Sequence, residues 1–137
     1  MNSPGSFNGV RLLLVDDEPH VTHILARRLT KLGAEVRVAR DGKEGLAEAI
    51  AFEPQVIVSD LQMPRMDGLD MAVALAANES SAGIPIVMIS GRGFLLDDDR
   101  TRETRIVEIL EKPFSISAVI SVLSRILEAP YAGEAAA

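Results

Sequence analysis

The sequence contains no cysteine and no tryptophan, and aromatic residues make up only 4% of its 137 positions. Without cysteine there can be no disulfide framework, no thiol nucleophile and no cysteine-ligated zinc site. So few aromatic rings argue against a stacking platform for nucleic-acid bases. The formal net charge of -6 at pH 7 also disfavours binding to a phosphate backbone. We therefore expect this domain to make no direct contact with nucleic acid.

Long apolar runs are missing as well. None approaches the roughly 18 to 20 residues that a membrane helix needs. The opening stretch, MNSPGSFNG, has neither the basic region nor the apolar core of a secretory signal. We expect no membrane association and a cytoplasmic location.

What the sequence does contain is enough apolar residues for one well-packed domain. Hydrophobic residues account for 47% of the chain and charged residues for 25%, as in globular proteins. We expect residues 1–9 to be a flexible N-terminal segment, residues 10–128 to form the domain, and residues 129–137 to be a C-terminal tail or the stub of a linker.

Short apolar runs alternate with segments of helical spacing about five times. The runs lie at residues 10–15, 35–39, 56–59, 84–89 and 106–110, and the last helical segment spans residues 116–127. Most of the runs lack strict polar alternation, which is typical of parallel strands buried on both faces. Right-handed crossovers then place helices on both sides. The sequence thus predicts an α/β fold, a doubly wound sheet of five parallel strands with about five flanking helices.

Polar side chains follow these runs at the ends where parallel strands share one edge of a sheet. Asp16 and Asp17 follow the first run, Asp60 the third, Ser90 the fourth and Lys112 the fifth. Ligands bind at this edge of doubly wound sheets. Three crowded carboxylates repel unless a cation joins them, and an oxygen-only site suits Mg²⁺ or Mn²⁺ better than zinc. With Lys112 and a dication, such a site would suit a phosphoryl group.

Five motifs carry a resemblance to a known family. They are LLVDDEP (residues 13–19), DGKEGL (41–46), SDLQMPRMDG (59–68), VMISG (87–91) and EKPF (111–114). In this order they resemble the receiver domain of two-component response regulators, as in chemotaxis regulators, over nearly the whole chain. The resemblance implies a flavodoxin-like strand order 2-1-3-4-5. It also implies a switch that is phosphorylated by a histidine kinase or histidine phosphotransfer protein and signals to a downstream protein or a fused output domain.

The resemblance also assigns roles within the site. Asp60 corresponds to the phosphate acceptor, and Asp16 and Asp17 correspond to the acidic pair that binds Mg²⁺, one of them through water. The backbone carbonyl of Gln62 would complete the metal site. Ser90 corresponds to the switch hydroxyl and Lys112 to the lysine that contacts the phosphate.

The family pattern leads to three more specific expectations. A cis peptide bond is expected between Lys112 and Pro113. Residues 91–105 hold two glycines and many charges, so we expect a short or displaced helix there and the least regular part of the fold. Ile109 stands where many receivers have a movable aromatic residue. Because its χ1 is stiff, we expect Ile109 to keep one buried rotamer on phosphorylation.

Other interpretations remain open at this stage. Asp16 and Asp17 can also be read as a polar turn before a helix, capped by Asp17 or Glu18. The alternative function is an aspartate-nucleophile phosphatase or phosphotransferase on a similar fold. Such enzymes commonly place a second aspartate two residues after the nucleophile, whereas Gln62 stands there in this chain. We therefore expect a signalling switch that catalyses only its own phosphorylation and slow autodephosphorylation.

Overall fold

A computed structural model describes residues 7–91 and 99–136, with side chains to residue 128. Five parallel strands form one sheet in the order β2-β1-β3-β4-β5. The strands are β1 (Arg11–Val15), β2 (Glu35–Ala39), β3 (Val56–Asp60), β4 (Ile86–Ser90) and β5 (Ile106–Glu111). The helices are α1 (Pro19–Lys31), α2 (Gly42–Phe52), α3 (Gly68–Ala77) and α4 (Ile116–Ala136), with the short 3-10 helix η2 at Asp99–Glu103. The predicted fold class and strand order are confirmed, and the four α-helices come close to the five expected.

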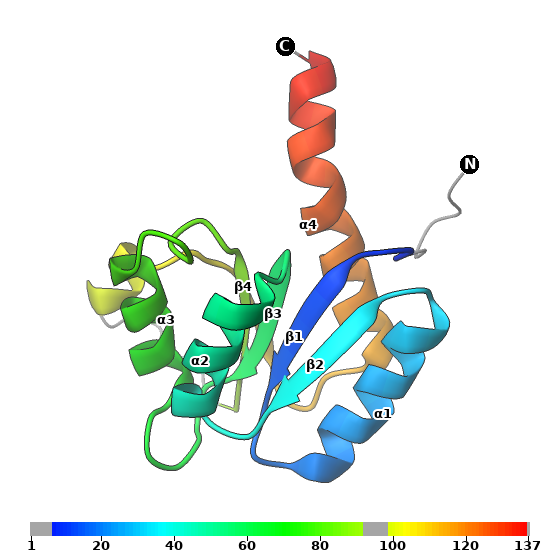
Figure 1. The fold of residues 1–137 in the computed structure, drawn as a ribbon. Helices are drawn as coiled ribbons and strands as arrows, with labels where there is room; N and C mark the ends of the chain where they lie inside the picture. Colours follow the sequence, from blue (N-terminus) through cyan, green and yellow to red (C-terminus); the bar gives the residue numbers. More distant parts are fainter. Residues whose placement is uncertain (1–6, 92–98, 137) are drawn as a thin grey trace.

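Helices cover both faces of the sheet, so the core has two halves (Figure 1). Successive side chains of a strand point to opposite faces. Leu12 and Leu14 of β1 pack with residues of α1 and α4, while Leu13 and Val15 pack with residues of α2 and α3. All residues of β3 and β4 are buried. This packing fixes the central strands, and with them the carboxyl ends at which the polar residues lie.

Aspartate side chains begin two of the helices. Asp41 caps α2 by accepting a hydrogen bond from the backbone N–H of Glu44 at 2.8 Å. Asp67 caps α3 by accepting one from the N–H of Asp70 at 2.8 Å. Each cap satisfies a backbone donor that the helix itself leaves free. The two loops that enter these helices are therefore well defined.

The packed domain begins before residue 10. Phe7 is only 1% exposed within the core half beside α1 and α4, and its N–H donates to the carbonyl of Leu32 at 2.8 Å. The N–H of Gly9 donates to Gly33. Phe7 thus belongs to the packed domain, although the sequence predicts a flexible segment over residues 1–9. An isolated aromatic residue between Ser6 and Asn8 gave no periodic signal of burial.

The last helix is longer than its apolar spacing predicts. Its apolar face packs against the sheet as far as Leu127, yet α4 continues to Ala136. This final part, drawn in red, projects past the end of the sheet (Figure 1). The apolar spacing indicated only the packed part of α4, and Pro130 and Gly133, both poor helix formers, gave no signal that the helix continues. That residues 129–137 act as a linker stays a prediction.

The region from residue 91 to β5 is partly as expected. Its described part contains only the 3-10 helix η2, in agreement with the predicted short helix, while residues 92–98 lie outside the described residues.

The expected burial of Ile109 is wrong, because its exposure is 37%. β5 is an edge strand whose residues alternate between half-buried and exposed, and a register shift interrupts its pairing with β4. Among the described residues, no helix combines the length and apolarity needed to cross a bilayer.

Candidate functional site

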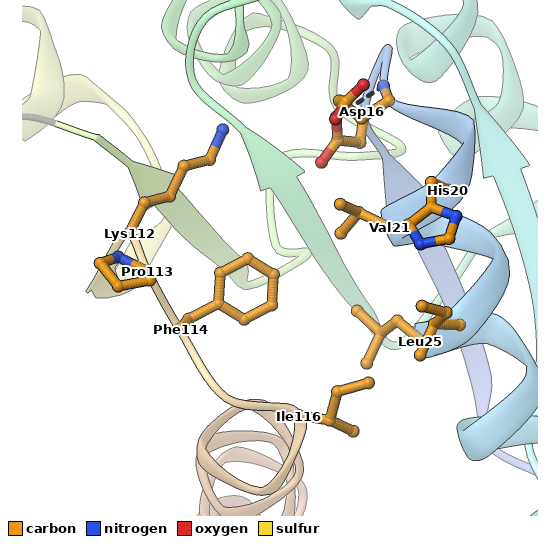
Figure 2. A pocket seen from close by; sticks show the side chains of 10 residues that line it. Asp16, His20, Val21, Leu25, Lys112, Pro113, Phe114 and Ile116 are labelled. Atoms are coloured by element: carbon orange, nitrogen blue, oxygen red, sulfur yellow. Dashed lines mark hydrogen bonds between the residues drawn. The ribbon is translucent and has the colours of Figure 1, made fainter.

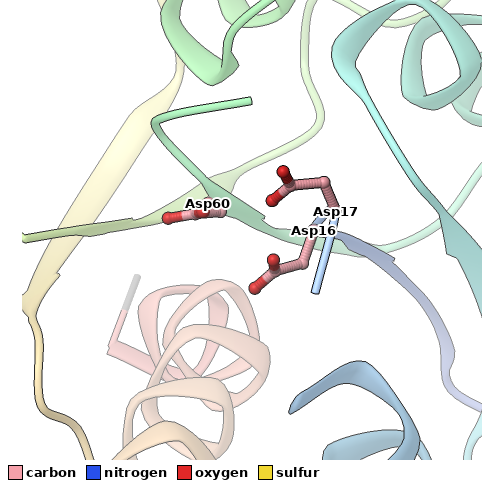
Figure 3. Close-up of side chains that lie close together, drawn as sticks. All are labelled: Asp16, Asp17 and Asp60. Carbon is pink, nitrogen blue, oxygen red and sulfur yellow. The ribbon is translucent and has the colours of Figure 1, made fainter. Parts of the chain in front are cut away.

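Three aspartates meet where β1 and β3 end. These strands pair with Val15 opposite Ser59, so the next residue of each, Asp16 and Asp60, lies at the same edge. One carboxylate oxygen each of Asp16, Asp17 and Asp60 lies within 4.8 Å of the others (Figure 3). Asp16 and Asp60 are 6% and 4% exposed, whereas Asp17 is open to solvent. Two buried acids and one exposed acid thus form a site that solvent can reach.

Burial raises the pKa of both buried aspartates, Asp16 and Asp60. It raises the pKa of Asp16 to about 6, against a smaller opposing effect of the Glu18 N–H, which donates to Asp16 Oδ1 at 2.9 Å. Burial also raises the pKa of Asp60, although Lys112 lowers it by hydrogen bonding and by its charge. A dication among the three carboxylates would offset this cost, since it favours their charged forms. The oxygen-only ligands and the exposed Asp17 fit Mg²⁺, which keeps several waters when bound.

Lys112 reaches Asp60 from the end of β5. Its Nζ lies 3.0 Å from Asp60 Oδ1, and its side chain is 39% exposed. Its backbone N–H donates to the carbonyl of Ser90 at 2.9 Å, which holds the ends of β4 and β5 together. Ser90 is 1% exposed. The peptide bond between Lys112 and Pro113 is cis, as predicted.

A short loop, residues 61–68, leads from β3 into α3 and carries Gln62. Its two ends are joined, because the N–H of Gly68 donates to the carbonyl of Leu61 at 2.8 Å. A Cβ at position 68 would lie only 2.4 Å from the backbone oxygen of Asp60, so glycine is required there. Gln62 is exposed within this loop. That its carbonyl binds the metal stays a prediction.

The structure brings Asp16, Asp17, Asp60 and Lys112 together, as the sequence predicts, with Ser90 at the end of the strand between β3 and β5. The polar-turn interpretation of Asp16 and Asp17 is confirmed only in part, because the two residues form the turn before α1 but no side chain caps the helix. Glu18 is the N-cap residue of α1, and its side chain makes no capping hydrogen bond. Asp16 accepts from the Glu18 N–H and otherwise faces the acidic cluster.

Sequence reasoning missed one contact beside the site. Arg65, in the loop at 61–68, places its Nε 2.7 Å from Oδ2 of Asp41. The pKa of Asp41 is lowered, first by the N–H of Glu44 and then by Arg65. The two residues stand 24 positions apart in different loops. No periodic pattern could have paired them.

Sequence reasoning also missed a groove of about 540 Å³ that opens beside the acidic cluster. It runs between the first turns of α1 and the segment from Lys112 to the start of α4 (Figure 2). Asp16 and Lys112 lie at one end, and the lining beyond them is mainly apolar. The lining residues are Asp16, Glu18, His20, Val21, Ile24, Leu25, Lys112, Pro113, Phe114 and Ile116.

Comparison with known proteins settles the family. Residues 12–124 match the family model described as the response regulator receiver domain. The chain belongs to this family. The transcriptional regulator RpaA of Synechocystis sp. is 29% identical over 117 residues, which cover 85% of this chain and 48% of RpaA. The chain thus spans about half the length of this relative.

Solved structures agree with the assignment. The chemotaxis response regulator CheY4 of Vibrio cholerae superposes with a TM-score of 0.78 at 28% identity, covering 87% of this chain and 99% of CheY4. The receiver domain of the sensor histidine kinase PA1611 of Pseudomonas aeruginosa superposes with a TM-score of 0.77 at 24% identity, covering 87% of this chain and 98% of that domain. That structure has a magnesium ion coordinated in its active site cleft. By its match to the family model, this chain is a receiver domain of two-component signalling, and receiver domains are signalling switches.

Proposed function

We propose that this receiver accepts a phosphoryl group on Asp60 and that the reaction depends on Mg²⁺. The observation that carries the proposal is the meeting of three carboxylates at one sheet edge, with Lys112 Nζ 3.0 Å from Asp60 Oδ1. An acid that is 4% exposed and paired with a lysine is held in a fixed orientation. Asp60 ends β3, so its carboxylate lies at the carboxyl edge of the sheet beside Asp16 and Asp17.

Asp16, Asp17, Asp60 and the carbonyl of Gln62 would hold the metal, and Mn²⁺ can use the same ligands. Bound there, the ion supplies positive charge that neutralises phosphoryl oxygens. A carboxylate oxygen of Asp60 attacks phosphorus, an O–P bond forms, and the N–P bond to the donor histidine breaks. Lys112 then contacts a phosphoryl oxygen instead of the carboxylate alone, and the Ser90 hydroxyl donates to another. This movement of Ser90 and Lys112 is the signal.

The donor in this proposal is a histidine kinase or a histidine phosphotransfer protein in the cytoplasm. The groove beside Asp16 and Lys112 supports this choice, since its apolar lining would let a helix pack close to Asp60. The receiver of a response regulator passes its signal to a downstream protein or a fused output domain. With Gln62 where a phosphatase would place a general acid, we propose slow autodephosphorylation and no further catalysis.

The test is incubation with acetyl phosphate and Mg²⁺, followed by intact mass. We expect the wild-type mass to rise by one phosphoryl group, and the rise to disappear with EDTA or in Asp60→Asn. Asp99→Asn, which removes an exposed carboxylate of η2, is the matched control and should be labelled like wild type. A phosphoryl group on Asp60→Asn would show that another residue is the acceptor.

A further inference from the structure

The backbone at Arg65 is strained. Its φ is +68°, in the left-handed region that non-glycine residues seldom occupy. The N–H of Met66 donates to the carbonyl of Pro64 at 2.8 Å, so Arg65 is the central residue of a three-residue γ-turn. With a positive φ this is the rare, strained form of that turn. Such a conformation persists only where surrounding contacts hold it.

The contacts that hold it come from the start of α2. Arg65 Nε lies 2.7 Å from Asp41 Oδ2, while the other oxygen of Asp41 caps α2. The N–H of Gly42 donates to the carbonyl of Met66 at 2.9 Å. A Cβ at position 42 would lie 2.5 Å from that same oxygen, so the two loops touch through their backbones. The tip of the loop at 61–68 is thus fixed to α2.

The other end of this loop is fixed to the acceptor strand. Gly68 packs against the backbone of Asp60 and closes the loop onto Leu61. Gln62 lies between these two fixed points. Residues 61–68 are therefore held at the tip by the Arg65–Asp41 ion pair and the Gly42–Met66 hydrogen bond, and at the base by the Gly68–Leu61 hydrogen bond.

We propose that Arg65 and Asp41 are positioning residues for the metal site. Their ion pair holds the strained turn, and the turn holds the carbonyl of Gln62 where it can bind a cation beside Asp60. This inference rests on the proposed function, because it assumes that the three aspartates bind Mg²⁺. It adds that a residue outside the acidic cluster sets the affinity for the ion.

The sign of the expected effect separates positioning from electrostatics. Removing a positive charge near three carboxylates strengthens cation binding, by an amount that salt screens. Loss of a positioned ligand weakens it, and removal of an outer partner of a metal site typically costs roughly tenfold or more in affinity. We therefore expect Arg65→Ala to bind Mg²⁺ roughly tenfold more weakly than wild type. Calorimetric titration of the metal-free protein measures this directly.

Arg65→Gly tests whether the ion pair acts by holding the strained turn. Glycine accepts a positive φ without strain. Without metal, this variant should therefore unfold at a urea concentration at least as high as Arg65→Ala does. Because glycine takes the turn without the ion pair, the Mg²⁺ affinity of Arg65→Gly should fall less than that of Arg65→Ala. Arg37→Ala is the matched control. It removes an exposed arginine of β2 whose Nη1 lies 3.2 Å from Oε1 of Glu48 on α2, and it should leave Mg²⁺ affinity unchanged.

Asp41→Asn tests whether Arg65 acts through Asp41. Asparagine can still cap α2, but it removes the charge that holds Arg65. Arg65→Ala should therefore lower Mg²⁺ affinity much less in the Asp41→Asn background than in wild type. Equal falls in the two backgrounds would contradict a shared role.

The results also distinguish the positioning role of Arg65 from the proposed function on which it rests. If wild type binds Mg²⁺ and both Arg65 variants bind it equally well, the positioning role is wrong while the metal site stands. If Arg65→Gly loses as much affinity as Arg65→Ala, the ion pair does not act by holding the strained turn, and the role is again wrong. If wild type binds no Mg²⁺, both proposals fail.

Discussion

Asp16 is a buried acid that the metal-free protein holds at a cost. Its pKa is raised to about 6 chiefly by burial, so at neutral pH the folded chain keeps a carboxylate charged where water solvates it poorly. Because the folded pKa lies above the unfolded one, Asp16 contributes most to stability when it is protonated. That contribution is complete below about pH 4 and is lost as the pH rises through 6.

We therefore expect Asp16→Asn to flatten the pH dependence of stability without metal. In wild type with EDTA, Asp16 should lower the free energy of unfolding between pH 4 and 7 by up to roughly 3 kcal/mol. Asparagine cannot ionise, so the variant should lose the part of the pH dependence that comes from Asp16. The raised pKa of Asp60 should preserve a remaining part. Urea unfolding at pH 4, 5, 6 and 7 measures both.

The neighbouring acid provides the control for this prediction. Asp17→Asn should keep the slope, because the buried Asp16 is still present. If Asp16→Asn showed the wild-type slope, the pH dependence would have to come from other groups.

At this scale the sequence predicted the acids and the lysine because each directly follows a strand. It could not say that Asp16 is buried and Asp17 exposed, since both follow the same apolar run. Nor could it pair Arg65 with Asp41, because that contact depends on how two loops pack.

Among the elements, α3 begins against the backbone of the acceptor. Gly68, its first residue, stands against Asp60, and a Cβ there would also lie 2.8 Å from the sulfur of Met88. The methionine sulfur can move, but the backbone oxygen of Asp60 cannot move without shifting the end of β3. The glycine in this motif is therefore a packing requirement.

Gly68→Ala should lower the free energy of unfolding by about 1–3 kcal/mol, the range for overpacking a core, or by more. It should also slow phosphorylation by acetyl phosphate, since the end of β3 is displaced. Gly83→Ala is the matched control, with no atom within 4 Å of the added Cβ, and should change neither quantity. Urea unfolding and the labelling rate check both. Wild-type stability in Gly68→Ala would mean that β3 and α3 can separate freely.

The sequence predicted where the strands lie along the chain better than it predicted what surrounds each strand in the fold. The apolar runs located all five strands, but the exposure of Ile109 depends on β5 lying at the edge with a register shift. Ile109 therefore has no buried pocket to leave. We still expect no change of its rotamer on phosphorylation, now because it already lies at the surface.

Over the whole molecule, strand order creates the site. Spacing alone predicts five parallel strands, whereas the order 2-1-3-4-5 came from the family resemblance. That order puts β1 between β2 and β3, so that Asp16 and Asp60 become neighbours although they stand 44 positions apart in the sequence. The packing of the entire sheet thus holds the three acids close together despite their mutual repulsion.

Because of this, Mg²⁺ should stabilise the whole domain. A ligand that binds only the folded state at 100 times its Kd adds about 2.7 kcal/mol, which for a domain of this size raises Tm by on the order of 10 °C. Asp17→Asn should lose most of this rise because it loses a ligand. Lys112→Ala should keep or enlarge it, because it removes a cation that lies 3.0 Å from Asp60 and competes with the metal. Thermal unfolding with increasing MgCl₂ at constant ionic strength measures all three proteins. An equal rise in wild type and Asp17→Asn, or its loss in Lys112→Ala, would contradict the roles assigned to these two residues.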